Sequence, residues 1–281
     1  MKDRDSFLKD APAEDPFYRK IFQTLPDRPF EAILSAKGDG SLSGIPAAQK
    51  AAEVLGLRAS WGKQNGDSVR SGEEIAHFQG TPERIVKMEN LVIGLLGKAS
   101  GIASAARQAL EISEGKIHLV SGGWKKHPFA IKDLIREAVE AGGVSTRIVE
   151  PPFVYLDKNY VRIFGGIGKA LEAVGHCPGE KVIQLRGEFA PIAQEAREAI
   201  RLGAGVVMVD TGSREDLDEV LRILREEKAS PRVKCAFAGG IQLKDIPALA
   251  ARGVDILDIG AAILDAPWLE LSYDVVAGDC G

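Results

Sequence analysis

After residue 115 the chain alternates short apolar runs with stretches of helical period. Apolar runs bounded by turn residues are typical of buried strands, and apolar positions that repeat with the helical period are typical of amphipathic helices. Regular alternation of the two requires parallel strands joined by helical crossovers. The predicted strands are 117–120, 144–149, 153–156, 181–186, 205–210, 232–237 and 254–259, and the predicted helices are 128–141, 166–175, 190–202, 213–228 and 243–252.

The first part of the chain has a different pattern. Segments 31–44 and 58–80 combine β-like alternation with turns at 38–40 and 65–67, where glycine stands beside Asp or Asn. Such dipeptides suit hairpins and tight loops, because glycine adopts the backbone angles that these turns require. Residues 45–57 lie between the two segments and predict a short amphipathic helix.

A long helix is predicted over residues 81–113. Thr81 is a suitable N-cap, and Pro82 follows at the first helical position, where its missing N–H group costs nothing. Three glycines interrupt the helical pattern and predict either close packing against a neighbouring segment or a break near residue 100. These glycines are Gly94, Gly97 and Gly101.

The predicted fold class is α/β, an incomplete or irregular βα-barrel preceded by a smaller α+β domain. The domains are expected at 1–113, including the long linking helix, and at 114–281. An open doubly wound sheet is the alternative. Two glycine-rich turns, at 237–240 and 258–262, favour the barrel, because turns after the last strands of such barrels commonly hold a phosphate with backbone N–H groups.

Composition narrows the function classes. The formal charge of −4 argues against general nucleic-acid binding, and no apolar stretch is long enough to span a membrane. The charged N-terminus, residues 1–15, lacks the apolar core of a signal peptide, so a cytoplasmic protein is expected. Cys177, Cys235 and Cys280 are too few for a disulfide framework or a zinc site and are expected to be buried or incidental.

The motif SGGWKKHPF (121–129) follows the predicted strand 117–120 and gathers cations where a barrel would begin a catalytic loop. Lys125 and Lys126 can bind an anion or supply a nucleophile. His127 can act as an acid or phosphate partner, or it can cap a helix that begins near residue 128. Trp124 can stack on a planar heterocycle or pack against the rim of the barrel.

Four segments resemble the quinolinate and nicotinate phosphoribosyltransferases, also called type II phosphoribosyltransferases or nicotinate-nucleotide pyrophosphorylases. GDGSLSGIPAAQ (38–49) and QNGDSVRSGEEIAHFQG (64–80) resemble parts of the N-terminal domain in that family. ENLVIGLLGKASGIAS (89–104) is similar to its long helix, and residues 238–276 resemble its closing phosphate-binding segment. The resemblance therefore runs through nearly the whole chain.

This resemblance implies transfer of the phosphoribosyl group of phosphoribosyl pyrophosphate (PRPP) to a pyridine nitrogen, with release of pyrophosphate, in NAD-type nucleotide synthesis. It implies Mg²⁺ with PRPP as co-substrate, and Asp210 is the acidic residue expected near the metal. The implied 5′-phosphate cradle consists of Ala238, Gly239, Gly240, Gly260 and Ala261.

The part of the chain that corresponds to the acceptor pocket departs from the family pattern. Quinolinate enzymes have Arg, Lys and two Thr before a Pro, whereas Trp124 stands here at the arginine and Lys125 keeps the lysine. Their Asn-His-Arg is replaced by 145–147, Ser-Thr-Arg, and their Lys-Asp-Asn-His is replaced by 157–160, Asp-Lys-Asn-Tyr. Asn90 replaces an arginine. The glutamate expected near 182–188 has three competing equivalents, namely Gln184, Arg186 and Glu188.

Counting charges favours a monocarboxylate acceptor. Quinolinate is a dianion, and a buried dianion without cationic partners is strongly disfavoured. The remaining cations predict a nicotinate-like acceptor and weak or absent quinolinate activity. The candidate catalytic residues are Lys125, Asp210, Arg147 and His127, and the candidate acceptor-binding residues are Lys126, Trp124, Asn90, Thr146, Asp157 and Lys158.

Two other function classes fit the same residues. A Schiff-base aldolase would use Lys125 or Lys158 as its nucleophile. A non-catalytic homologue would keep the phosphate cradle and bind a nucleotide. The resemblance also implies a homodimer or larger homo-oligomer in which the N-terminal domain of one subunit roofs the barrel of another, bringing Asn90 to the neighbour's site. Small-molecule substrates are expected, with no nucleic-acid or membrane partner.

Overall fold

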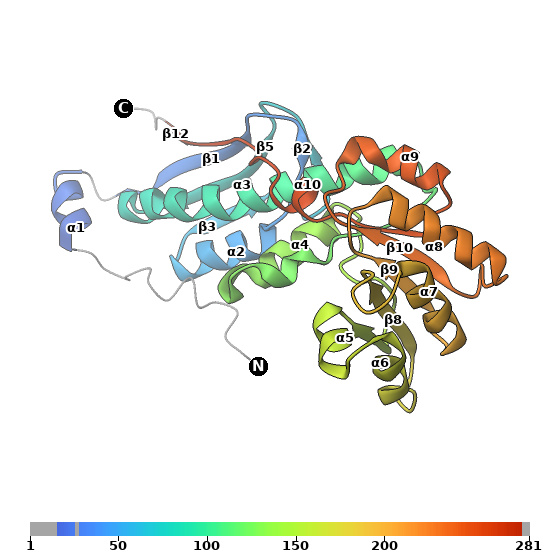
Figure 1. Cartoon of the computed structure of the whole chain (residues 1–281). Coiled ribbons are helices and arrows are strands. Elements are labelled where there is room, and N and C mark those ends of the chain that lie inside the picture. The colour runs from blue at the N-terminus through green and yellow to red at the C-terminus, as the bar shows by residue number, and fades with distance from the viewer. Residues whose placement is uncertain (1–15, 26–27, 277–281) are drawn as a thin grey trace. The chain divides into compact units, whose positions relative to one another are not determined.

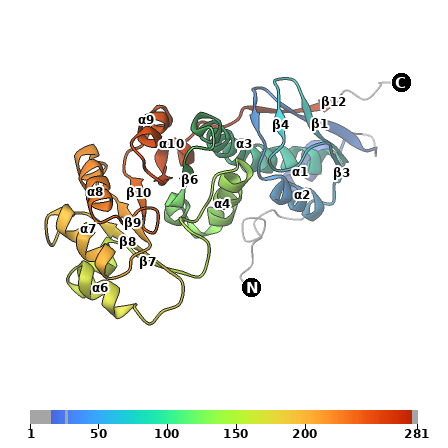
Figure 2. The ribbon, with the colours of Figure 1, turned by 90° about the vertical axis from the view of Figure 1, so that its right-hand side faces the viewer.

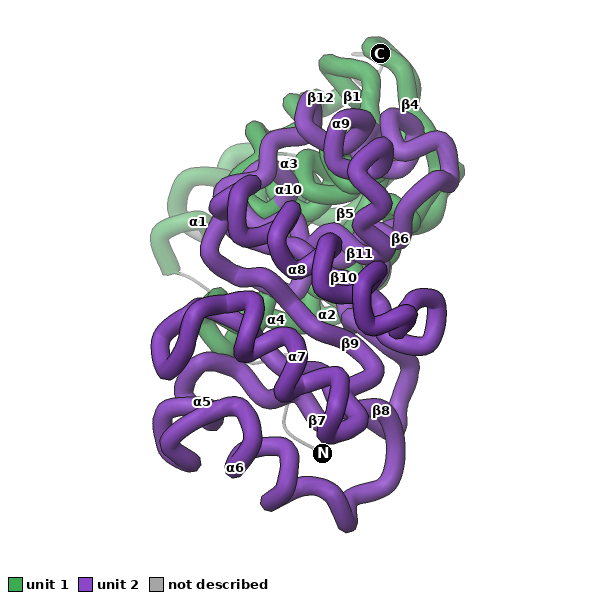
Figure 3. Tube along the Cα trace, turned by 45° about the vertical axis from the view of Figure 1, so that its right-hand side comes forward, with its two compact units in different colours: residues 1–107, 124–143, 264–281 green, residues 108–123, 144–263 purple. Residues whose placement is uncertain are grey.

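The computed structural model describes residues 16–25 and 28–276. The charged N-terminal segment 1–15 and Cys280, both considered in the sequence analysis, lie outside these residues. The chain forms two compact units (Figure 3). Both units are discontinuous in sequence, whereas the sequence analysis divides the chain once, after residue 113. Unit 1 comprises 1–107, 124–143 and 264–281, and unit 2 comprises 108–123 and 144–263.

Unit 1 contains an antiparallel four-stranded sheet in the order β12-β1-β5-β3 (Figure 1). Alternate residues of β1, among them Ala32 and Leu34, are fully buried, which is the pattern of a sheet with one face on a core. The last strand of the chain pairs directly with the first strand of the sheet, with Leu34 opposite Tyr273. The strands are β1 (Phe30–Ala36), β3 (Arg58–Trp61), β5 (Glu74–Gly80) and β12 (Leu271–Val276).

Helices and short connections complete unit 1. The predicted helix at 45–57 is confirmed as α2 and begins after Gly44, whose φ of 91° is a left-handed angle that suits glycine. The predicted helix at 128–141 begins later, because a 3₁₀ turn follows the extended Pro128. The elements are α1 (Pro16–Phe22), β2 (Gly40–Ser41), α2 (Ile45–Val54), β4 (Ser68–Val69), η2 (Gly122–Lys126), η3 (Phe129–Ile131) and α4 (Lys132–Ala141).

The long helix α3 (Pro82–Ser113) is continuous, so its glycines mark close packing and not a break. A Cβ atom on Gly101 would lie 2.1 Å from the carbonyl oxygen of Pro267, and one on Gly97 would lie 3.1 Å from the ring of Trp268. The amide of Leu269 donates a 3.0 Å hydrogen bond to the Gly97 carbonyl. The segment before β12 therefore lies directly on the helix backbone.

Unit 2 contains six parallel strands in the order β6-β11-β10-β9-β8-β7, so the predicted irregular βα-barrel is confirmed as a half-barrel. Helices α6 to α9 follow one another along the outer side of the strands (Figure 2). The strands are β6 (His118–Val120), β7 (Phe153–Leu156), β8 (Glu180–Leu185), β9 (Val206–Val209), β10 (Lys234–Ala238) and β11 (Ile256–Asp258). The helices are α5 (Lys158–Phe164), α6 (Ile167–Ala173), α7 (Ile192–Arg201), α8 (Arg214–Glu226), η4 (Leu243–Asp245), α9 (Ile246–Ala251) and α10 (Ala261–Leu264).

The predicted strand at 144–149 is wrong. Only Ser145 forms a bridge, to Val120 at the end of β6, and the rest of the segment has no ladder. The physical reason is the shape of the backbone. The bridge at Ser145 is parallel to β6, but residues 146–149 then form consecutive bends, so the segment leaves the sheet before a ladder can form. Ile148 still packs into the interior of the barrel.

Alternate residues of the six strands point into the half-barrel, as the period of a strand requires. Their apolar members form one interior cluster, and the partly buried Val149, Phe153 and Tyr155 pack against it. The same rows continue toward the carboxyl ends of the strands, where their side chains are polar. The cluster consists of Val120, Ile148, Val182, Val206, Met208, Ala236, Ala238 and Ile256.

Across residues 16–25 and 28–276, no helix combines the length and the apolar character needed to cross a lipid bilayer.

The contact between α3 and the 267–269 segment predicts a contrast between two glycines of one helix. Replacing Gly101 with alanine should lower the free energy of unfolding by about 1–3 kcal/mol, because the added methyl group overlaps backbone atoms. Gly94 faces open space, so Gly94→Ala should be neutral or stabilising by up to about 1 kcal/mol. Urea unfolding of both variants tests this, and equal stability of the two would contradict the close packing.

Candidate active site

Polar side chains gather where the strands of unit 2 end. Asp157, Arg186 and Asp210 come directly after β7, β8 and β9, and Asp258 is the last residue of β11. Each stands two positions after an inward-facing residue on its own strand, so the alternation of the strand directs it to the mouth of the half-barrel. In α/β folds this carboxyl end is where ligands bind.

A buried hydrogen-bonded group lies just beneath this mouth. The side chain of Gln184 accepts a 2.9 Å bond from the amide of Lys158 and donates a 2.7 Å bond to the Tyr155 hydroxyl, which lies 3.1 Å from the Met208 sulfur. Burial raises the pKa of Tyr155 well above its usual range, and the carboxylates of the mouth, Asp258 foremost, raise it further. Tyr155 is therefore a neutral hydroxyl below an anionic rim.

Asp157 has a local structural role. Its carboxylate accepts hydrogen bonds from the amides of Asn159 (2.8 Å) and Tyr160 (3.2 Å), which makes it the N-cap of α5. Helix α5 is absent from the helices predicted above, although an Asp directly before its first residue is a recognised start signal. The lysine of the exchanged pair, Lys158, is the exposed first residue of the helix.

Arg186 is paired with Asp210. Its Nη1 donates to Oδ2 of Asp210 at 2.9 Å and also to the backbone carbonyl of that residue. Its Nε lies 3.4 Å from Glu188, which in turn receives two 2.7 Å bonds from Arg162. These bonds from Arg162, reinforced by the charge of Arg186, hold the pKa of Glu188 below its usual value. Four side chains thus alternate in charge along the rim.

A buried carboxylate fixes the loop that carries Arg186. Glu195, in the first turn of α7, is 2% exposed. It accepts hydrogen bonds from three backbone amides, those of Arg186 (3.1 Å), Gly187 (2.9 Å) and Phe189 (3.2 Å). Glu195 is not among the predicted site residues, because nothing in the local pattern distinguishes it from the other acidic residues of an amphipathic helix.

The glycine turn after β10 is shaped by two left-handed residues, Gly239 (φ 108°) and Gly240 (φ 66°). A Cβ atom on Gly239 would lie 2.7 Å from the amide nitrogen of Gly212, so this turn and the turn after β9 approach closely. At Gly240 and at Gly260 a Cβ atom would meet nothing within 4 Å. Both predicted glycine turns thus have open space next to their backbone, as a site that binds an anion through backbone amides requires. Ala238 and Ala261 flank these glycines.

Asp258 attaches the SGGWKKHPF segment to the sheet. Its Oδ1 accepts a 2.8 Å hydrogen bond from the Gly122 amide, and the amide of Ser121 donates to the Ser145 carbonyl at 2.9 Å. Asp258 lies in a predicted glycine turn but is not among the predicted site residues. Its position at the end of an apolar strand, like that of Asp210, is the signal that could have identified it.

The remainder of that motif belongs to unit 1. Trp124 is half-buried, and the guanidinium of Arg136 lies 5.7 Å from its ring centroid. Lys125 and Lys126 are exposed, and His127 is half-buried after the 3₁₀ turn η2. No side-chain cap links His127 to η3 or α4. Asn90 is exposed on α3, also in unit 1. The four motif residues and Asn90 stay predicted site residues.

Arg147 faces a different place. It lines a cavity of about 750 Å³ together with the first residues of β6, β8, β10 and β11, which is the amino end of the half-barrel. Thr146 is buried, with 5% of its surface exposed. The structure therefore gathers Asp157, Lys158, Asp210 and the glycine turns at the carboxyl ends and does not bring Arg147 to them.

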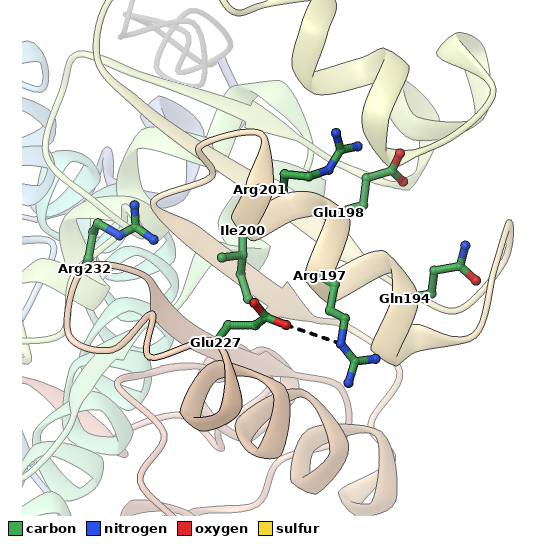
Figure 4. A pocket seen from close by; sticks show the side chains of 7 residues that line it. All are labelled: Gln194, Arg197, Glu198, Ile200, Arg201, Glu227 and Arg232. Carbon is green, nitrogen blue, oxygen red and sulfur yellow. Dashed lines mark ion pairs between the residues drawn. The ribbon is translucent and has the colours of Figure 1, made fainter.

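A second cavity, of about 600 Å³, runs along α7 and the loop that leads into β10. Figure 4 shows Arg197 and Arg201 pointing in different directions from α7, and Arg197 pairs with Glu227 at 3.5 Å. These cations do not converge on one point, and none of the predicted site residues lines the cavity. Its lining residues are Gln194, Arg197, Glu198, Ile200, Arg201, Glu227 and Arg232.

The donor set does not fit a resident metal ion. Within residues 16–25 and 28–276, no group of three or more His, Cys, Asp or Glu side chains is placed to hold one. Asp210, the predicted metal ligand, is paired with a guanidinium. Cys235 is buried, which raises the pKa of its thiol to about 12 and makes it a poor ligand or nucleophile. Cys177 is half-buried.

Two family models match consecutive parts of the chain. The model described as quinolinate phosphoribosyl transferase, N-terminal domain, matches residues 19–100, and the model for the C-terminal domain of the same family matches residues 102–274. Together they account for most of the 281 residues.

Individual relatives agree with the family models. The carboxylating nicotinate-nucleotide pyrophosphorylase of Homo sapiens is 26% identical over 257 residues, covering 89% of this chain and 83% of the human protein. The probable enzyme of the same name from Bacillus subtilis is 26% identical over 276 residues, covering 96% and 90%. A nicotinate-nucleotide pyrophosphorylase from Ehrlichia chaffeensis shares the fold, with a TM-score of 0.83, 17% identity and coverage of 98% and 100%.

Proposed function

The chain belongs to the quinolinate phosphoribosyl transferase family and is an enzyme of the phosphoribosyltransferase class, and we propose that its acceptor is quinolinate. In the proposed reaction the pyridine nitrogen bonds to the anomeric carbon of PRPP and pyrophosphate leaves. The carboxylate next to the nitrogen then departs as carbon dioxide, and a proton from solvent takes its place on the ring carbon, which yields nicotinate mononucleotide for NAD synthesis.

The observation that carries the proposal is the pairing of an open glycine cradle with an anionic barrel mouth. The cradle at Gly240 and Gly260 has room for the 5′-phosphate beside backbone amides. The carboxylates of Asp157, Asp210 and Asp258 surround the mouth and favour the positive charge that develops on the ribose as pyrophosphate leaves. Lys125 and Lys126 are the proposed partners of the departing pyrophosphate and the acceptor acid.

Nicotinate is the second candidate acceptor, because the acceptor-binding residues depart from the family pattern. Asp157 stands where the family has a lysine, and its carboxylate serves as the cap of α5. An added carboxylate disfavours a dianion more than a monoanion. The preference for nicotinate nevertheless gains no support from the relatives, which are named as carboxylating enzymes of the quinolinate family.

Magnesium is proposed to enter with PRPP, as the counter-ion of its pyrophosphate, and so belongs to the substrate. In the described part of the chain, residues 16–25 and 28–276, no cluster of side chains would hold the ion in advance. The protein's own contribution is then to hold the phosphate end in the cradle and to orient the ribose between the rim carboxylates.

The first expected outcome is acceptor-dependent release of pyrophosphate from PRPP. With quinolinate, nucleotide and carbon dioxide should form in equal amounts, and turnover should exceed that with nicotinate. The measurement is pyrophosphate release with Mg²⁺, followed by chromatography of the nucleotide product.

Faster turnover with nicotinate would transfer the proposal to the second candidate. Binding of PRPP without turnover of either acid would contradict the proposed function and favour a non-catalytic nucleotide-binding homologue. The Schiff-base alternative predicts borohydride trapping of a keto acid or aldehyde on Lys125 or Lys158.

The cradle makes a separate prediction about Gly260. A methyl group there meets no protein atom, so Gly260→Ala should change the free energy of unfolding by less than about 0.5 kcal/mol. The methyl would occupy the space proposed for the phosphate, and the KM for PRPP should rise about tenfold or more, since one displaced charge-assisted bond is worth about 1.5–3 kcal/mol. Gly94→Ala is the matched control, and an unchanged KM would contradict the cradle.

The oligomeric state stays a proposal. We propose a homodimer or larger homo-oligomer in which Asn90 of one subunit approaches the site of another. Sedimentation of the full chain at the mass of a dimer or more supports this assembly, and a monomer at assay concentrations contradicts it.

A further inference from the structure

We propose that the guanidinium of Arg186 is the resident cation of Asp210, so that Asp210 is not a metal ligand in this protein. The significance for catalysis rests on the proposed function, but the assignment itself rests on contacts within unit 2. It departs from the expectation, stated above, that Asp210 holds Mg²⁺.

Arg186 donates to two acceptors on Asp210. Nη1 of Arg186 lies 2.9 Å from Oδ2 of Asp210 and also donates to the backbone carbonyl of the same residue. The side chains are 29% and 28% exposed, so the pair is partly shielded from water and from salt. A divalent cation at Asp210 would lie next to a fixed positive charge and would lose the carboxylate oxygen that the guanidinium already binds.

The neighbouring carboxylates are also engaged. Glu188 receives two bonds from Arg162 and faces Nε of Arg186, so Glu188, like Asp210, has an arginine partner. Asp157 caps α5, and Asp258 accepts from the Gly122 amide. Magnesium and manganese prefer several oxygen ligands in near-octahedral geometry. The rim offers them carboxylates that already have partners.

Arg186 is held in this position by the backbone. The carboxylate of Glu195 accepts from the amides of Arg186, Gly187 and Phe189, which fixes the loop at its base. Releasing Asp210 to a metal would require the side chain of Arg186 to leave both acceptors on Asp210 and also Glu188. The fixed loop therefore favours the ion pair over a metal-bound arrangement.

The test uses Mn²⁺ alone as the probe, with the full chain and no substrate. Electron paramagnetic resonance measures the free Mn²⁺ that remains with protein in excess. Wild type and Asp210→Asn should leave the same free signal. Arg186→Glu replaces the cation with a carboxylate beside Asp210 and Glu188, and it should bind Mn²⁺ about tenfold or more tightly than wild type, because affinity follows the charge count of the ligands. The double variant R186E/D210N should lose this gain.

Arg197→Glu is the matched control, because Arg197 also pairs with glutamates in unit 2 but does not contact Asp210. Circular dichroism establishes that each variant is folded, and Arg186→Gln replaces R186E if that variant is not. The assignment is overturned if wild type binds Mn²⁺ and Asp210→Asn abolishes the binding. It is also overturned if the folded Arg186 variant gains nothing, or if R197E gains as much.

These outcomes are independent of turnover. Pyrophosphate release from PRPP tests the proposed function, whereas Mn²⁺ binding without PRPP tests only the occupancy of Asp210. A protein that turns over quinolinate and also binds Mn²⁺ through Asp210 would retain the function and refute the role of Arg186.

Discussion

Side-chain alternation along six parallel strands is the constraint on which the second unit depends. Each strand sends every second side chain inward, and the inward rows begin as an apolar core around Val182, Met208 and Ala236. Toward the carboxyl ends of the strands, the inward-facing residues of the same rows are polar, namely Gln184, Arg186, Asp210 and Asp258. The core and the candidate active site are therefore two ends of the same rows, and a one-residue change of register would displace both.

Along one part of the mouth, from Arg162 to Asp210, charges are balanced locally and not by the protein as a whole. A formal net charge of −4 says little about a rim where Arg162, Glu188, Arg186 and Asp210 alternate within hydrogen-bonding distance. Isolated exposed pairs contribute little to stability, but a network on a loop fixed by a buried carboxylate has a defined geometry. The rim thus presents ion pairs of fixed orientation, and a bound ligand would contact these pairs rather than isolated charges.

Sequence patterns were sufficient for the elements that run with the sheet. Residues 153–156 were predicted with the bounds of β7, and both glycine turns were found at the strand ends. The strand at 144–149 was wrong because hydrophobicity reports burial, and Ile148 is buried without joining a ladder. Apolar content does not specify whether a buried segment stays extended long enough to pair with its neighbour.

The candidate site was harder to predict, because its chemistry depends on pairing. Asp210 stands out at a strand end, but its bond to Arg186 requires the alignment of β8 with β9, in which Gln184 lies opposite Met208. The argument for a monocarboxylate acceptor counted Asp157 as an added negative charge and did not foresee its role as a helix cap. Glu195 gave no signal at all. The sequence gives the number of charged side chains. The binding of a ligand depends on which of these side chains already have a partner within the protein.

The pairing of β1 with β12 has a consequence for how the protein is made. The sheet of unit 1 needs residues 30–36 and also residues 271–276, so it lacks one edge strand until synthesis has passed residue 276. All of unit 2 emerges from the ribosome before that strand does. Domains made first usually fold first, but here the earliest segment must wait for the latest. During that interval β1 presents an unpaired edge, and such edges can pair with strands of other chains.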